Sequence, residues 1–182
     1  YFYSQDIDVK IISGDNPRAV SAVAKNAGVR NAESFIDMSD VSEDEINNIA
    51  DKYTVFGRVT PKQKKLLIEA MQNAGHKVAM TGDGVNDLLA MRRADCSVAM
   101  GSGCDAARRA AQLVLLDSDF SVLKDVISEG RRVVNNIRTA ASMFLIKTIF
   151  SVLLSLITIF FGDAYPFEPI QMSLISACAV GI

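Results

Sequence analysis

The most informative segment of this chain is Thr81-Gly82-Asp83-Gly84-Val85-Asn86-Asp87. It follows the apolar run HKVAM at 76–80, which predicts a buried strand, and precedes LLAM at 88–91, which begins a helix. The glycines let the backbone approach an anion, and the helix N-terminus offers unpaired N–H groups. Asp83 and Asp87 supply the hard oxygen ligands that Mg²⁺ prefers. The stretch therefore predicts a turn that holds Mg²⁺ and a phosphoryl group together.

Two further segments have the same character. Residues 10–17 (KIISGDNP) run from an apolar strand into a turn, where the Ser13 hydroxyl and the following N–H groups suit phosphate oxygens. Residues 56–64 (FGRVTPKQK) open a helix with a capping box and a proline at its first position. Lys64 lies on the first turn of that helix, where its ammonium reaches a phosphate as a point charge. An Asp-Gly pair alone marks only a tight turn, and Lys64 alone is typical of a solvated surface, so the prediction depends on all three segments.

Strands and helices alternate along most of the chain. The expected strands are 9–12, 54–56, 76–80, 96–100 and 112–116. The expected helices are 17–26, 42–53, 61–73, 87–94 and 105–111. This order predicts an α/β fold with a parallel, Rossmann-like sheet and helices on both faces, followed by transmembrane α-helices. In such a sheet the active turns gather at the C-terminal ends of the strands.

An apolar stretch of 22 residues, 140–161, is long enough to cross a bilayer. It is apolar all round, which fits lipid better than the alternative, a buried core helix in a domain this small. From Ala140 onward the only charged residues are Lys147, Asp163 and Glu168. Three arginines precede the stretch, which predicts that residues 1–138 are cytoplasmic. Because 119–161 contains no proline, one helix or two in tandem form a rod of roughly 60 Å.

Composition limits the other possibilities. The chain has 182 residues, 49% of them hydrophobic, and a net charge of −2, which gives no argument for nucleic acid as a partner. Three cysteines form no C-x-x-C pair, which predicts a reducing compartment and no disulfides. The single histidine, His76, has no ligand partner at metal spacing. The chain has no initiating Met and stops inside a second apolar run at 167–182, so we expect a part of a longer protein.

In order and spacing, Ser13-Gly14-Asp15, Arg58…Pro61…Lys64 and the heptad at 81–87 resemble the phosphorylation domain of P-type (E1–E2) cation-transporting ATPases. That family belongs to the haloacid-dehalogenase superfamily. Residues 129–137 (EGRRVVNNI) are similar to the segment that leads into its fifth transmembrane helix. The resemblance implies three parts. They are 1–128, the C-terminal part of the phosphorylation domain; 129–162, a stalk and transmembrane helix; and 163–182, an external loop and the start of the sixth transmembrane helix.

The resemblance also implies ATP, Mg²⁺ and an aspartyl-phosphate whose nucleophile lies outside this chain, because the D-K-T-G-T motif is absent from it. By position, Asp83 would ligate Mg²⁺ and Asp87 would support the metal shell. The residues implied to hold the phosphoryl group are Lys64, Asn86, Ser13 and Gly14. Those implied to lie on the cofactor side are Asp15, Arg58, Thr81 and Gly82. The implied partners are the lipid bilayer, a transported ion, most simply a cation, and the rest of the same polypeptide: nucleotide-binding and actuator domains and other transmembrane helices.

The transported ion stays open. Thr148 and Ser151 stand where calcium pumps have an Asn and a Glu, and Ser176 and Val180 stand where they have an Asn and an Asp. With Lys147, the residues Thr148, Ser151 and Ser176 are the candidates for a transport path. Lys147 either faces that path or lifts its ammonium to the membrane interface. Two other function classes also fit: a soluble phosphatase of the same superfamily, and a catalytically inactive membrane scaffold.

Overall fold

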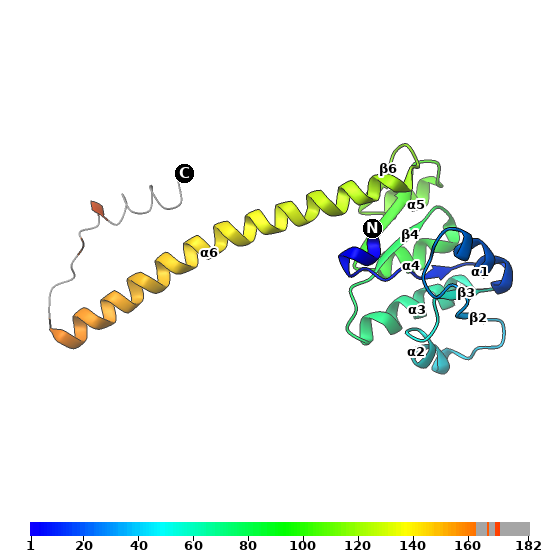
Figure 1. The fold of residues 1–182 in the computed structure, drawn as a ribbon, viewed down its shortest axis with the longest axis horizontal. Coiled ribbons are helices and arrows are strands. Elements are labelled where there is room, and N and C mark those ends of the chain that lie inside the picture. Colours follow the sequence, from blue (N-terminus) through cyan, green and yellow to red (C-terminus); the bar gives the residue numbers. More distant parts are fainter. Residues whose placement is uncertain (163–166, 168–169, 172–182) are drawn as a thin grey trace. The chain divides into compact units, whose positions relative to one another are not determined.

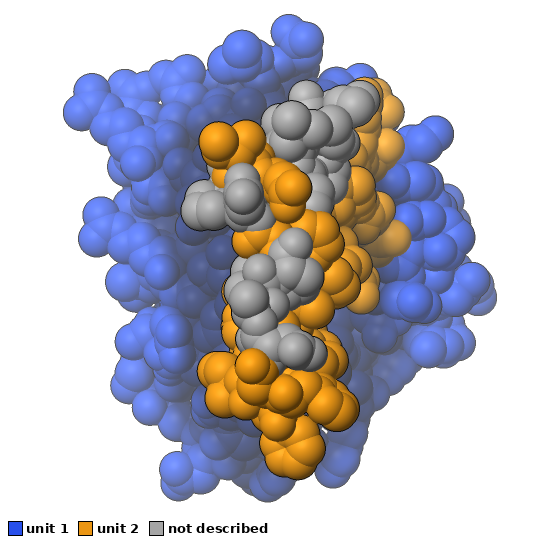
Figure 2. Space-filling view, turned by 90° about the vertical axis from the view of Figure 1, so that its left-hand side faces the viewer, with its two compact units in different colours: residues 1–124 blue, residues 125–182 orange. Residues whose placement is uncertain are grey.

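The computed structural model describes residues 1–162, 167, 170 and 171 (Figure 1). Its contacts divide the chain into two compact units, Tyr1–Lys124 and Asp125–Ile182 (Figure 2). The expected external loop and next helix at 163–182, with Ser176, Val180 and Cys178, fall outside the described residues except at positions 167, 170 and 171.

The first unit contains two three-stranded sheets in which every strand pair is parallel. One has the order β1-β3-β2 and the other β4-β5-β6. The strands are β1 (Ile11–Ile12), β2 (Phe35–Asp37), β3 (Val55–Gly57), β4 (Ala79–Gly82), β5 (Cys96–Met100) and β6 (Leu113–Leu115). The α-helices of this unit are α1 (Pro17–Asn26), α2 (Ile46–Ile49), α3 (Pro61–Asn73), α4 (Leu88–Arg93) and α5 (Asp105–Ala110). Short 3₁₀ helices are η1 (Phe2–Gln5), η2 (Glu43–Glu45), η3 (Val85–Asp87) and η4 (Phe120–Val122). The predicted α/β fold with parallel strands is confirmed.

Helix starts were easier to predict than element lengths. Thr60 caps α3 with Gln63 in a capping box, and Pro61 is its first residue, as predicted. The Ser42 capping box also forms, but it opens only η2 and the four-residue α2 instead of a helix to residue 53. Two asparagines in α2 explain the early stop, because Asn hydrogen-bonds to its own backbone and disfavours a helix interior. Strand β2 was not predicted, since only three residues pair with β3.

Helix α3 packs in both large core clusters of the first unit. Its Leu67 belongs to one cluster with Phe56 and Met38, and its Ile68 to another with Met91. Each of these side chains is fully or almost fully buried, and burying one such apolar side chain contributes about 1.5–3 kcal/mol.

Strands β1 and β4 lie at the edges of their sheets. Ile12 of β1 packs against both large clusters, and so does Val78, which directly precedes β4. The two edge strands therefore border the same apolar interior.

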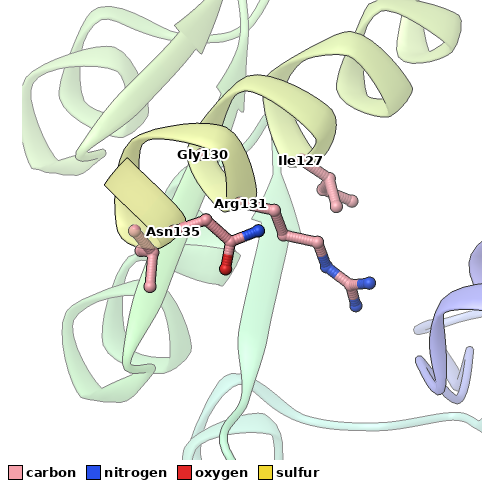
Figure 3. Close-up of a pocket in the computed structure, with 5 residues that line it drawn as sticks. Ile127, Gly130, Arg131 and Asn135 are labelled. Atoms are coloured by element: carbon pink, nitrogen blue, oxygen red, sulfur yellow. The ribbon is translucent and has the colours of Figure 1, made fainter. Parts of the chain in front are cut away.

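Helix α6 (Leu123–Phe161) is one continuous helix of 39 residues, about 58 Å long. Together with η4 it is long and apolar enough, by length and composition, to cross a membrane. Its most apolar segment has a mean hydropathy of 2.3, and none of that segment is buried in the structure. The sequence allowed either one long helix or two helices in tandem, and the single helix is confirmed. Around Gly130 the helix surface has a shallow hollow, lined also by Ile127, Arg131, Val134 and Asn135 (Figure 3).

The carboxylate of Asp95 joins three parts of the first unit. It accepts hydrogen bonds from Gln72 Nε2 of α3 at 2.9 Å, from the Val78 amide at 3.0 Å and from Lys77 Nζ at 3.0 Å. The bonds from Gln72 and Val78, followed by that from Lys77, hold the pKa of Asp95 well below its ordinary value. Because the folded-state pKa is depressed, this stabilisation is present above the unfolded pKa of about 3.9 and is lost as pH falls toward the folded value.

We therefore expect Asp95→Asn to lower the melting temperature of the protein at pH 7 more than at pH 3. Thermal unfolding followed by circular dichroism at both pH values measures the two differences. Asp40→Asn, at an exposed aspartate, is the control. The prediction would be contradicted if the difference in melting temperature between wild type and Asp95→Asn were as large at pH 3 as at pH 7.

Candidate functional site

The heptad spans the C-terminal end of β4, the 3₁₀ helix η3 and the residue before α4. The expected strand at 76–80 is displaced, because Thr81 and Gly82 pair with β5 and belong to β4, whereas residues 76–78 do not. Asp83 and Asn86 are exposed, whereas Asp87 is buried at the N-cap position of α4. Gly82 makes this arrangement possible, because a Cβ added there would lie 2.6 Å from the Cβ of Asp87. The turn therefore presents two polar side chains to solvent and keeps one carboxylate inside.

The buried carboxylate pairs with Lys64. The Nζ atom of Lys64 donates to Oδ1 of Asp87 at 2.7 Å, and the two side chains are only 11% and 12% exposed. The solvated-surface interpretation of Lys64 is therefore wrong. An ammonium carries three donors, so this bond orients the Lys64 side chain while two N–H groups stay available for another oxygen. A positive group is thus fixed beside the turn that carries Asp83 and Asn86.

A second group of predicted residues gathers at the ends of β1 and β3. The Ser13 hydroxyl accepts from the Asp15 amide and donates to the Asp15 carboxylate, both at 3.1 Å. The Ser13 carbonyl accepts from the Val59 amide at 3.0 Å, and the Asp15 carbonyl accepts from the Arg58 amide at 2.8 Å. Arg58 adopts a left-handed φ of 53°. The two turns are therefore fastened together through their backbones.

The Arg58 guanidinium in turn pairs with Asp37 of β2 at 3.3 Å. Hydrogen bonds from the Ser39 hydroxyl and amide, together with Arg58, hold the pKa of Asp37 below its ordinary value. The Asp37 carboxylate therefore stays charged and remains the ion-pair partner of Arg58.

The structure brings the predicted residues together as two groups at the C-terminal ends of parallel strands. Lys64 and Asp87 touch each other beside Asp83 and Asn86, with Thr81 and Gly82 in β4 just before them. Ser13, Gly14, Asp15 and Arg58 form the other group. Lys147, Thr148 and Ser151 belong to α6 in the second unit, where the Thr148 hydroxyl donates to the Phe144 carbonyl at 2.9 Å.

The donor set fits Mg²⁺ in chemistry. Asp83 offers an exposed carboxylate, and exposed oxygen ligands of this kind suit a metal that keeps several waters. In the part of the chain that the structure describes, no three His, Cys, Asp or Glu side chains converge as a metal cluster. Cys96 and Cys104 are free thiols.

Sequence analysis missed one turn at this site, Gly101–Cys104 after β5. The Cys104 amide donates to the Asp83 carbonyl at 2.8 Å, and a Cβ added to Gly103 would lie 2.9 Å from the same oxygen. The signal that could have revealed it is the G-S-G sequence directly after an apolar strand, the same pattern that marks the heptad.

Known proteins match this chain in both sequence and fold. Residues 4–95 match the model of the haloacid dehalogenase-like hydrolases. Over its whole length the chain is 48% identical to a probable cation-transporting ATPase, exp7, of Streptococcus pneumoniae, and 43% identical to the calcium-transporting ATPase CtpE of Mycobacterium bovis. It spans 24% of the length of each of these relatives.

Two solved structures are similar in fold. A zinc-transporting PIB-type ATPase in its E2.Pi state superposes with a TM-score of 0.62 at 26% identity, covering 94% of this chain and 23% of that one. The catalytic domain of the CPx-ATPase CopB-B superposes with a TM-score of 0.55 at 28% identity, covering 69% and 41%. The matched family model extends over half of the chain, across both groups of site residues as far as Asp95, and the chain belongs to the haloacid dehalogenase-like hydrolase family.

Proposed function

We propose that this chain is part of an ATP-driven P-type cation pump that works through an aspartyl-phosphate on a residue outside the chain. The observation that carries the proposal is the largely buried Lys64–Asp87 pair beside the exposed Asp83 and Asn86. Phosphoryl transfer depends mainly on positioning and charge stabilisation, and this arrangement supplies both. The whole-chain likeness to cation-transporting ATPases supports the same reading.

In this proposal each group of side chains has a separate task. Asp83 binds Mg²⁺ with support from Asp87, and the metal, when bound, neutralises phosphoryl charge. Lys64 and Asn86 donate to the phosphoryl oxygens. Ser13 and Gly14 hold the remaining oxygens from the side of β1. The residues on the cofactor side are Asp15, Arg58, Thr81 and Gly82.

The edge strands suggest where the nucleophile comes from. β1 and β4 carry the two groups of site residues at their C-terminal ends, and both are edges that border one apolar interior. A strand from the rest of the polypeptide that pairs with both would deliver its own C-terminal end between the groups. We therefore assign the aspartate nucleophile to such a strand.

The membrane part of the proposal concerns α6. We assign 1–128 to the phosphorylation domain, 129–162 to a stalk and transmembrane helix, and 163–182 to an external loop and the next span. The length and hydropathy of α6 support a lipid-embedded helix in a multi-pass cell-membrane protein with residues 1–138 in the cytoplasm. The remaining partners are the nucleotide-binding and actuator domains and the other transmembrane helices.

Calcium is the first cation to test. Several relatives carry the name calcium-transporting ATPase, including CtpE at 43% identity. Hydroxyl side chains at Thr148 and Ser151 give weaker Ca²⁺ ligands than carboxylates, so most of the ion's charge would be balanced elsewhere in the protein.

The proposal is tested on the intact protein with γ-³²P-labelled ATP. We expect an acid-stable, hydroxylamine-sensitive label that depends on Mg²⁺ and responds to Ca²⁺ or another cation. The 182-residue chain alone is expected to carry no label. An intact protein that hydrolyses small phosphate esters without label in the membrane fraction would favour the soluble phosphatase, and absence of both activities would favour the inactive scaffold.

We expect Lys147→Ala to change cation-stimulated dephosphorylation of the intact pump by about tenfold without altering membrane insertion. A charge within the apolar stretch is costly, and such residues usually face a polar path. Lys147→Arg should restore the rate only partly, because the guanidinium is larger and planar. Transport and dephosphorylation equal to wild type in Lys147→Ala would instead favour an ammonium lifted to the interface.

A further inference from the structure

We propose that the turn Gly101–Cys104 is a positioning element for Asp83, holding the main chain of that residue so that its carboxylate meets the metal. The inference rests on the proposed function for the identity of the metal. The turn lies outside both groups of candidate site residues, the one around Asp83 and the one around Ser13.

The first observation is the contact itself. The Cys104 amide donates to the Asp83 carbonyl at 2.8 Å. The missing side chain of Gly103 leaves room for this approach, since a Cβ there would lie 2.9 Å from the Asp83 oxygen and 3.1 Å from its Cα. Backbone atoms cannot move away from an added Cβ as a flexible side chain can. Residue 103 must therefore be glycine for Asp83 to stay where it is.

The second observation is that the turn has its own anchors at the end of β6. The Gly101 amide donates to the Leu115 carbonyl at 2.7 Å, and a Cβ on Gly101 would lie 2.2 Å from the Leu116 carbonyl oxygen. The Ser102 amide donates to the Ser118 hydroxyl at 2.8 Å, and that hydroxyl donates to the Ser102 hydroxyl at 2.9 Å. The turn is therefore a rigid support.

Asp83 needs such a support because it is the first residue after β4 and is followed by a glycine. Gly84 leaves the backbone on that side freer than any other residue would. The Asp83 side chain is exposed, so packing does not fix it. Loss of an outer partner of a metal ligand typically costs roughly 10–100-fold in metal affinity.

Two substitutions in the intact pump test the turn, each with a matched control. Gly103→Ala adds the clashing Cβ, and Gly130→Ala adds one where nothing lies within 4 Å. Cys104→Pro removes the N–H at a φ of −64° that proline accepts. Asp105→Pro places proline at the first helical position of α5, where the N–H has no partner within the helix.

The readouts are Mn²⁺ binding without ATP, followed by electron paramagnetic resonance, and the Mg²⁺ concentration that gives half-maximal phosphoenzyme. Only the Mn²⁺ binding that is lost in the Asp83→Asn variant is counted as binding at this site. We expect Gly103→Ala and Cys104→Pro to raise the half-saturating Mn²⁺ concentration and the half-maximal Mg²⁺ concentration by roughly tenfold or more. Both control variants should match wild type. Melting temperatures show which variants are folded.

Wild-type Mn²⁺ binding in a folded Gly103→Ala or Cys104→Pro would overturn the positioning role. Should Cys104→Pro fail to fold, Gly103→Ala decides alone. A protein that binds Mn²⁺ through Asp83 yet forms no phosphoenzyme would refute the proposed function and leave the positioning role standing.

Discussion

If the proposed function holds, Asp83→Asn in the intact protein is expected to reduce Mg²⁺-dependent phosphoenzyme formation by at least about 100-fold. A neutral amide is a poorer ligand for Mg²⁺ and cannot balance its charge. The fold should survive, because the Asp83 side chain is exposed and its main-chain bond to Cys104 does not involve the carboxylate. Labelling by γ-³²P-ATP across a range of Mg²⁺ concentrations measures the loss.

Asp40→Asn, which also removes a charge from an exposed aspartate, is the control for that experiment. It should label like wild type. Near-normal labelling of Asp83→Asn at ordinary Mg²⁺ would show that other residues hold the ion.

Lys64→Ala is expected to destabilise the first unit by about 3–5 kcal/mol, because it leaves the Asp87 carboxylate buried without its partner. Amide hydrogen exchange of Val55 and Phe56 in the buried strand β3 reports the free energy of unfolding of this unit. Lys65→Ala is the matched control. Its ion pair with Glu69, at 3.6 Å, is more exposed than the Lys64–Asp87 pair, with side chains 44% and 27% exposed, and pairs open to solvent contribute about 1 kcal/mol or less.

The double variant Lys64→Met, Asp87→Asn separates stability from chemistry. Replacing both charges removes the unpaired group, so most of the lost free energy of unfolding should return. Phosphoenzyme formation should stay low, because no ammonium remains to meet the phosphoryl group. If the double variant recovers labelling together with stability, Lys64 is a structural residue only.

Local signals made part of the fold predictable. The capping box and first-position proline of α3 depend on four adjacent residues, and the heptad at 81–87 combines turn glycines with the start of α4. Interactions of this kind depend only on residues that are adjacent in the sequence. The elements that went unpredicted or changed are short. β2 and α2 contain three and four residues, β1 has two of the four residues expected, and β4 lies at 79–82 instead of 76–80. Pairing with β3 or β5 and packing against α3 decide them.

The candidate site shows the same division. Sequence placed Asp83, Asn86 and Lys64 on turns at strand and helix ends, but the bond between Lys64 and Asp87 joins positions 23 apart. The support of Asp83 by Cys104 joins two turns that meet only because β4 and β5 are neighbours in a sheet. Contacts that depend on strand order are not visible in a single sequence.

The edge positions of β1 and β4 have a consequence for how this polypeptide behaves when it is made in pieces. An edge strand exposes a row of N–H and C=O groups that pairs readily with any extended chain. Because β1 and β4 are two such edges beside one apolar interior, we expect the 182-residue chain by itself to self-associate through pairing of the edge strands of neighbouring copies.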